Sequence, residues 1–181
     1  MVKHSNRALV LGAMSLLLAA CGTGIQEPVS RGQLDVLEAR TEAMDAMFAK
    51  QVAVVNLAEV ALGKLAQTNG GDQAIKDYGR KMEHDHTMAN EKLTAIAMKK
   101  GMTLPKEPDA EHKAVYDRLS KLSGKAFDTA YKNEMVKGHE KAIKLFEKEI
   151  AMGQDADLKG FASETLPTLK EHLKLAEKLP G

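Results

Sequence analysis

Four ionisable side chains fall on the apolar faces of four predicted helices: Glu59, His86, His139 and His172. His86 illustrates the pattern, because it lies four residues after Met82 and three before Ala89, which is the spacing of one helix face. Each of the four also lies near the middle of its helix. Antiparallel packing brings helix midpoints to one level, so we expect the four side chains to converge in one layer of the core. Imidazole and carboxylate are ligands that divalent transition ions accept in bundle cores.

This layer has two interpretations. A buried polar group without a partner costs about 1–3 kcal/mol, so four such groups need a metal, water or one another. The first interpretation is a mononuclear site in which three or four of these residues bind a divalent transition metal of unknown identity. The second is a metal-free network in which Glu59 pairs with one or more histidines and the layer serves only to specify the fold.

Two acidic residues close to His86 have other expected roles. Glu83 and His86 match the Glu-x-x-His step of di-iron bundles, but the matching positions before the other two histidines hold Val136 and Leu169. A six-ligand di-iron centre is therefore not expected. We expect Glu83 and Asp85 to orient ligands from outside the centre instead of binding the ion.

The elements that must position this layer follow from helical periodicity and end signals. The predicted helices cover 46–69, 72–100, 109–122 and 123–152, with a last one from 155 or 157 to about 179. Short turns make two antiparallel hairpins, and a long crossover with one short helix joins them. The sequence thus predicts an all-α, ferritin-like four-helix bundle over 46–181.

The N-terminus has the pattern of an export signal over 1–20, with basic residues before an apolar run that is too short to span a bilayer. Residues 18–21, Leu-Ala-Ala-Cys, resemble the lipobox of bacterial lipoproteins, which implies cleavage before Cys21 and a covalent lipid on its sulfur. We expect 21–45 to be a lipid-anchored tether with a possible helix extension over 34–44. Because Gly22 follows the cysteine, the resemblance implies an outer-membrane lipoprotein facing the periplasm, if the source has two membranes.

Charge and motifs limit the functional classes. Without Lys3 and Arg7 of the leader, the chain has 24 basic and 25 acidic residues, a balance that argues against a nucleic-acid surface. No Ser-His-Asp arrangement, phosphate loop or catalytic thiol is visible, so an enzyme is less expected than a binding protein. The sequence indicates a membrane as partner, through the lipid, and names no protein partner.

From about Phe48 to Leu179 the chain resembles a bacterial envelope family catalogued as domain of unknown function 4142, which is assigned to the ferritin-like superfamily. The resemblance lies in 57–60, 82–90, 124–131, His139 and 166–172. It implies an exported four-helix bundle and no agreed activity. We expect an envelope lipoprotein that binds a transition metal or serves stress protection without being an enzyme; the alternative is a structural or interaction protein with a metal-free layer.

Overall fold

The structure is a computed structural model, and it describes residues 30–181 apart from the side chain of Thr41. Five α-helices and no strand occur in this described range. The predicted signal peptide, Cys21 and the tether up to residue 29 lie outside it. The all-α prediction is confirmed, whereas the ferritin-like assignment in particular stays a prediction.

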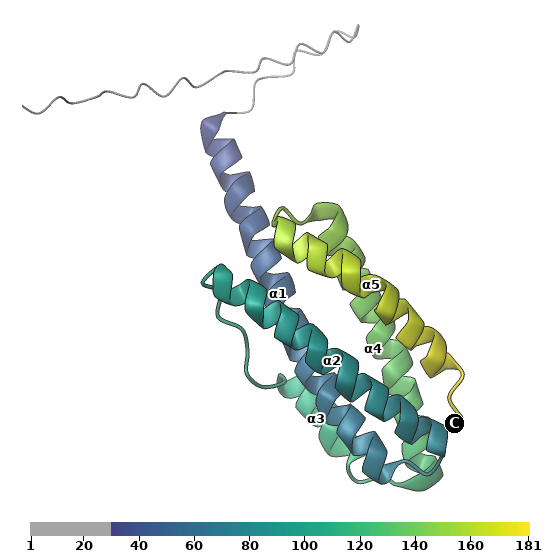
Figure 1. Cartoon of the computed structure of the whole chain (residues 1–181). Coiled ribbons are helices and arrows are strands. Elements are labelled where there is room, and N and C mark those ends of the chain that lie inside the picture. The colour runs from purple at the N-terminus through teal and green to yellow at the C-terminus, as the bar shows by residue number, and fades with distance from the viewer. Residues whose placement is uncertain (1–29) are drawn as a thin grey trace, which may run out of the picture.

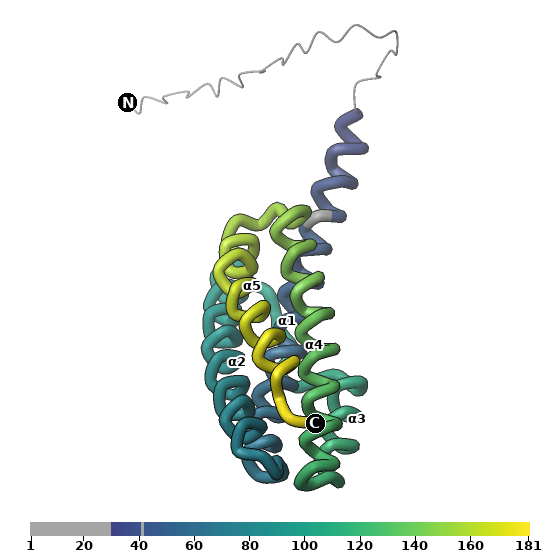
Figure 2. Tube along the Cα trace, turned by 90° about the vertical axis from the view of Figure 1, so that its right-hand side faces the viewer, coloured from purple at the N-terminus to yellow at the C-terminus, as the bar shows by residue number. Residues whose placement is uncertain are grey.

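Helix α1 spans Arg31–Asn69 and is longer than its apolar period indicated. Its start is a capping box, in which the Ser30 hydroxyl accepts from the Gln33 N–H and the Gln33 side chain accepts from the Ser30 N–H. The charged segment 34–44 is therefore helical, and Arg31 and Gly32, which were expected in the tether, already belong to α1. Figures 1 and 2 show this first part of α1 projecting beyond the other helices.

Of the described helices, α1 alone is long and apolar enough to cross a membrane. Its most apolar 18-residue window has a mean hydropathy of 1.3, and half of that window is buried inside the structure. A core helix meets the same criteria, so length and composition do not assign α1 to a membrane.

The other helices begin where short polar side chains can cap them. Helix α2 spans Gln73–Lys99, α3 spans Ala110–Leu119, α4 spans Gly124–Met152 and α5 spans Ala156–Glu177. The carboxylates of Asp72, Asp109 and Asp155 accept hydrogen bonds from the first turns of α2, α3 and α5. Ser123, the N-cap residue of α4, makes no such side-chain hydrogen bond.

The helices pack as two hairpins, α1 with α2 and α4 with α5 (Figure 1). Across the hairpins, α1 contacts α4 and α2 contacts α5. The chain after α2 runs back along the bundle to α3, so that α4 starts at the same end as α2. A parallel bridge between Gly70 and Gly124 fixes this junction.

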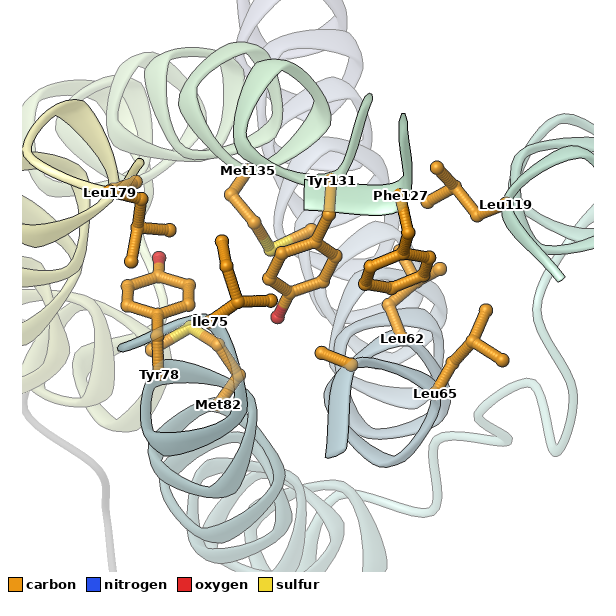
Figure 3. Packing of buried hydrophobic residues seen from close by; sticks show 12 residues of the cluster. Leu62, Leu65, Ile75, Tyr78, Met82, Leu119, Phe127, Tyr131, Met135 and Leu179 are labelled. Atoms are coloured by element: carbon orange, nitrogen blue, oxygen red, sulfur yellow. The ribbon is translucent and has the colours of Figure 1, made fainter. Parts of the chain in front are cut away.

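The apolar core consists of two clusters at different heights. One contains Leu62, Ile75 and the stacked rings of Phe127 and Tyr131 (Figure 3), and the other contains Phe48 with the rings packed around it. On each long helix, one or two buried polar residues occur between the parts that contribute to the two clusters. These residues are Asn56, Glu59, His86, His139 and His172. A polar layer therefore divides the core at mid-bundle.

Two aspartates, one in each hairpin, accept hydrogen bonds from the turn of the other hairpin. Asp128, near the start of α4, accepts from the N–H groups of residues 71 and 72 at 2.9 and 3.0 Å, in the turn before α2. Asp45, on α1, accepts from the N–H groups of residues 154 and 155, in the turn before α5. Each aspartate lies 27 residues before the N-cap of the second helix of its own hairpin. The same arrangement therefore occurs in both hairpins, and the aspartate of each hairpin stabilises the turn of the other.

Candidate metal centre

Three histidines from three helices meet in the polar layer. His86 of α2, His139 of α4 and His172 of α5 are only 3%, 1% and 1% exposed. Their ring centroids lie 5.4 to 5.8 Å apart, which makes a nearly equilateral triangle. One ring nitrogen of each lies within 4.8 Å of the corresponding nitrogens of the other two. We call these three residues the histidine triad.

Two rings of the triad are oriented by neutral oxygen acceptors. His86 Nδ1 lies 2.9 Å from Asn56 Oδ1, and His139 Nδ1 lies 2.8 Å from the carbonyl oxygen of Met135. A carbonyl oxygen can only accept, so each of these Nδ1 atoms carries the proton and each Nε2 atom has a free lone pair.

A carboxylate orients the third ring from the opposite side. His172 Nε2 donates to Asp85 Oδ2 at 2.7 Å, and Lys81 Nζ lies 3.1 Å from the same oxygen. Burial raises the pKa of Asp85, but the hydrogen bonds from His172 and Lys81 outweigh it and hold that pKa below its usual value. Asp85 is therefore ionised at neutral pH and can only accept. His172 consequently has its free lone pair on Nδ1.

The protons of the triad therefore point outward and the lone pairs point inward. His139 Nε2 and His172 Nδ1 face each other at 3.4 Å with no proton between them. His86 Nε2 is buried and has no hydrogen-bond partner. Three convergent nitrogen lone pairs form a site for a cation.

Burial also keeps the triad neutral. It lowers the pKa of His86 well below 6.5, helped by the other two histidines. It lowers the pKa of His139 to about 4, against the hydrogen bond to Met135, and it lowers that of His172 against the attraction of Asp85. A proton is thus a poor occupant of the site near pH 7, and neutral imidazole is the form that binds metals.

Glu59 lies in the polar layer but is not among the three converging groups. Its carboxyl group lies between α1 and α4, where the absence of a side chain at Gly138 leaves room for Oε1. Oε2 is buried without a partner. Burial, and then the charge of Glu134, raises the pKa of Glu59 to about 8, so this group is mostly protonated at pH 7. The structure brings the three predicted histidines together and leaves Glu59 beside them.

Glu83 points away from the layer. Its carboxylate accepts from Gln67 Nε2 at 2.7 Å and lies 3.7 Å from Lys64 Nζ, on the outer side of the α1–α2 hairpin. It orients no histidine, unlike Asp85. The Glu-x-x-His step in α2 therefore does not direct both side chains inward.

The partners of the rings at His86 and His139 did not follow from the sequence analysis. Asn56 lies three residues before Glu59 and four after Val52, so helical spacing could have identified it as a further inward polar residue. The carbonyl of Met135 gives no sequence signal, because every residue has one. The hydroxyl of Tyr78 donates to the carbonyl oxygen of His172 at 3.2 Å, and helical spacing does not predict this contact either.

A family model described as a domain of unknown function, DUF4142, matches residues 35–179. The chain belongs to the DUF4142 family. The match covers most of α1 and all of α2 to α5, so the triad and its orienting partners lie inside the DUF4142 domain. No curated protein and no solved structure matches the chain. The family description carries no activity, and functional inference therefore depends on the site.

Proposed function

We propose that this DUF4142 chain is a metal-binding protein whose histidine triad holds one divalent transition ion. The observation that carries the proposal is the inward direction of all three lone pairs. In metal sites, a ligating histidine usually donates its other N–H to a carboxylate, a carbonyl or water. The triad has two such partners, with an amide oxygen as the third. The proposed role is metal handling or stress protection, not catalysis.

The donor set agrees with a small borderline ion. Zinc–imidazole bonds of about 2.0–2.1 Å in a tetrahedron separate neighbouring ligand atoms by roughly 3.3–3.4 Å. His139 Nε2 and His172 Nδ1 are 3.4 Å apart, which agrees with this separation. A small inward movement of His86 would bring the third nitrogen to the same separation, so that three coordination positions would be filled. Neutral imidazoles suit Zn²⁺, Cu²⁺, Ni²⁺ or Fe²⁺ better than Mg²⁺ or Ca²⁺. A three-histidine set leaves at least one coordination position open.

The alternative function is structural, with the layer as a metal-free network that fixes helix register. The outward hydrogen bonds favour it, because each ring already has one partner. It leaves two lone pairs opposed at 3.4 Å and a third unpaired, which a network should avoid. The metal-binding proposal accounts for all three.

Metal content tests the proposal. Protein without a His tag, reconstituted with Zn²⁺, is expected to retain one ion per chain after desalting. His86→Ala, His139→Ala and His172→Ala each remove one ligand and should lose most of that metal, whereas the exposed His84→Ala should retain it. Metal near zero in the wild type, with a melting temperature insensitive to chelators, would support the network instead.

We also propose that Cys21 anchors the protein to the outer membrane, with the bundle facing the periplasm. The support is the Leu-Ala-Ala-Cys stretch at 18–21 after a short apolar run. Expression of the full chain with labelled palmitate should label the wild type and not Cys21→Ala. Equal labelling of both would refute the anchor.

A further inference from the structure

A cavity of about 500 Å³ opens to solvent between α1, α3 and α4. Apolar side chains such as Val54, Val115 and Leu145 form much of its wall, and charged side chains of both signs line it as well. This volume lies within the range of about 300–1,000 Å³ that is common for ligand sites. It is more than a hydrated metal ion requires.

The wall of this cavity includes residues that neighbour the histidine triad, although no histidine of the triad lines it. Met135 lines the cavity, and its carbonyl oxygen orients the ring of His139. Gly138, the residue directly before His139, also lines it. Glu59 lines it from α1. Three residues of α1, a rise of about 4.5 Å, separate Glu59 from Asn56, which orients His86. Glu59 therefore borders the cavity and belongs to the same buried polar layer as the triad.

The carboxylates that line the cavity differ in their partners. Asp109, Glu111 and Glu134 pair with His112, Lys141 and Arg118 respectively. Glu59, only 6% exposed, has no ion pair within the part of the chain that the structure describes, and its Oε2 is unpartnered. It is the one lining carboxylate that is free to receive a cation.

The opposite face of the triad is less suited to entry. There, between α2 and α5, Asp85 already holds His172 and also pairs with Lys81. Lys81 lies 3.7 Å from Glu171 as well, so an ammonium group stands at this approach. Ammonium groups line the cavity as well, from Lys50, Lys137 and Lys141, so the two approaches differ in the unpaired carboxyl group of Glu59 and not in their cations.

We propose that the cavity between α1, α3 and α4 is the entrance through which a divalent metal ion reaches the buried triad, and that Glu59 is the ligand that receives the ion and transfers it to the histidines. This inference rests on the proposed metal-binding function. It assigns a kinetic role to Glu59, which sets how fast the ion enters and leaves. Glu59 gives up its proton to water in the cavity when its oxygen binds the ion, and it takes a proton back when the ion passes to the histidine nitrogens.

Stopped-flow uptake of Co²⁺ by the full chain, followed by its visible absorbance, tests the entrance. Glu59→Gln removes the carboxyl group that must give up its proton to bind the ion, and Gly138→Val adds methyl groups where a Cβ alone would lie 3.4 Å from Glu59 Oε1. Both variants should slow uptake and chelator-driven release about tenfold and leave the dissociation constant within about threefold. The matched controls Glu147→Gln and Gly160→Val change the same residue types away from the cavity and should keep wild-type rates.

The outcomes separate the two proposals. Wild-type rates in both cavity variants, with Co²⁺ still bound, would overturn the entrance and leave the triad site standing. A large loss of affinity in Glu59→Gln with unchanged uptake would make Glu59 a permanent ligand and overturn its transfer role. No Co²⁺ bound by the wild type would remove the metal site and the entrance together.

Discussion

At the scale of single residues, the triad depends on three different acceptors for its three outward protons. An amide, a backbone carbonyl and a carboxylate each fix one ring. Only the carboxylate carries a charge, and it makes the His172 nitrogen on the other side of the ring a stronger donor to a cation. Of the three orienting acceptors, Asp85 should therefore contribute most to the affinity of the triad for the ion, although it does not contact the ion.

We predict that Asp85→Asn weakens Zn²⁺ binding about 10- to 100-fold, the usual effect of losing such an orienting partner. A competition titration against a chromophoric chelator measures it. Glu83→Gln is the matched control, because Glu83 contacts Gln67 and Lys64 and no histidine. Equal affinities of the two variants would contradict the orienting role of Asp85.

Glu149 predicts a pH dependence of stability away from the triad. Burial, and then the charge of Asp45, raises its pKa from 4.5 to about 7. The folded state therefore binds the proton more tightly than the unfolded state does, and stability falls as pH rises from about 4.5 through 7. Glu149→Gln, which cannot ionise, should lose this fall.

Thermal melts of the wild type and Glu149→Gln at pH 5 and pH 8 measure this dependence. The variant should gain stability relative to the wild type at pH 8, and the exposed Glu147→Gln should not. Because other groups titrate equally in both proteins, the difference between them isolates Glu149. A constant difference across the range would show that the shift is absent.

The candidate site was predictable in part. One inward residue per helix follows from the spacing, and the three histidines do meet. The separation of Glu59 from them was not predictable, because helix periodicity gives the face of a residue and not its height to within one turn. Glu59 lies beside Gly138 of α4, and such a contact between two helices is a tertiary property that spacing along one helix does not give.

At the scale of elements, α1 and α2 pack backbone against backbone. A Cβ at Gly63 would lie 2.6 Å from the carbonyl oxygen of Gly79, and one at Gly79 would lie 2.7 Å from Ala66 Cβ and from the Gly63 carbonyl oxygen. These glycines cost helix propensity, and the close contact compensates for it. At Gly160 a Cβ would meet nothing within 4 Å, so no such compensation exists there.

We predict opposite effects for two identical substitutions. Gly79→Ala forces the helices apart and should destabilise the protein by about 1–3 kcal/mol in spite of better propensity. Gly160→Ala lies in an open helix position and should stabilise it by up to about 1 kcal/mol. Denaturant unfolding compares them, and the same sign for both would contradict the close packing of α1 and α2.

The helix ends show why the element predictions succeeded and where they fell short. Aspartates after glycine or before a new apolar period marked the starts of α2, α3 and α5. The start of α1 was predicted only as a possible helix extension over 34–44, because this segment is charged and largely exposed and its apolar period fades. Ser30-x-x-Gln33 is itself a capping-box pattern and could have located that start.

At the scale of the whole molecule, the polar layer interrupts the core between two apolar clusters. A bound ion would link α2, α4 and α5 in the polar layer, where the apolar core is interrupted. Since only the folded state assembles the triad, metal in hundredfold excess over its dissociation constant should add about 2.7 kcal/mol of stability.

For a chain of this size, that gain corresponds to a rise in melting temperature of roughly 5–10 °C. Scanning calorimetry with Zn²⁺ should show the rise in the wild type and not in His139→Ala. Mg²⁺, a poor partner for imidazole, is the control ion. An equal response of wild type and variant would show that zinc stabilises the fold from elsewhere.

Asp45 and Asp128 each accept hydrogen bonds from the turn of the other hairpin, which implies that the two hairpins could recognise each other without a covalent link. A cut between the exposed Lys106 and Glu107 would leave His86 on one piece and the other two histidines on the second. Each piece would carry the carboxylate that the turn of the other piece requires. Mixed together, the two fragments should reassociate, and a metal ion bound by histidines of both fragments would then stabilise the split protein.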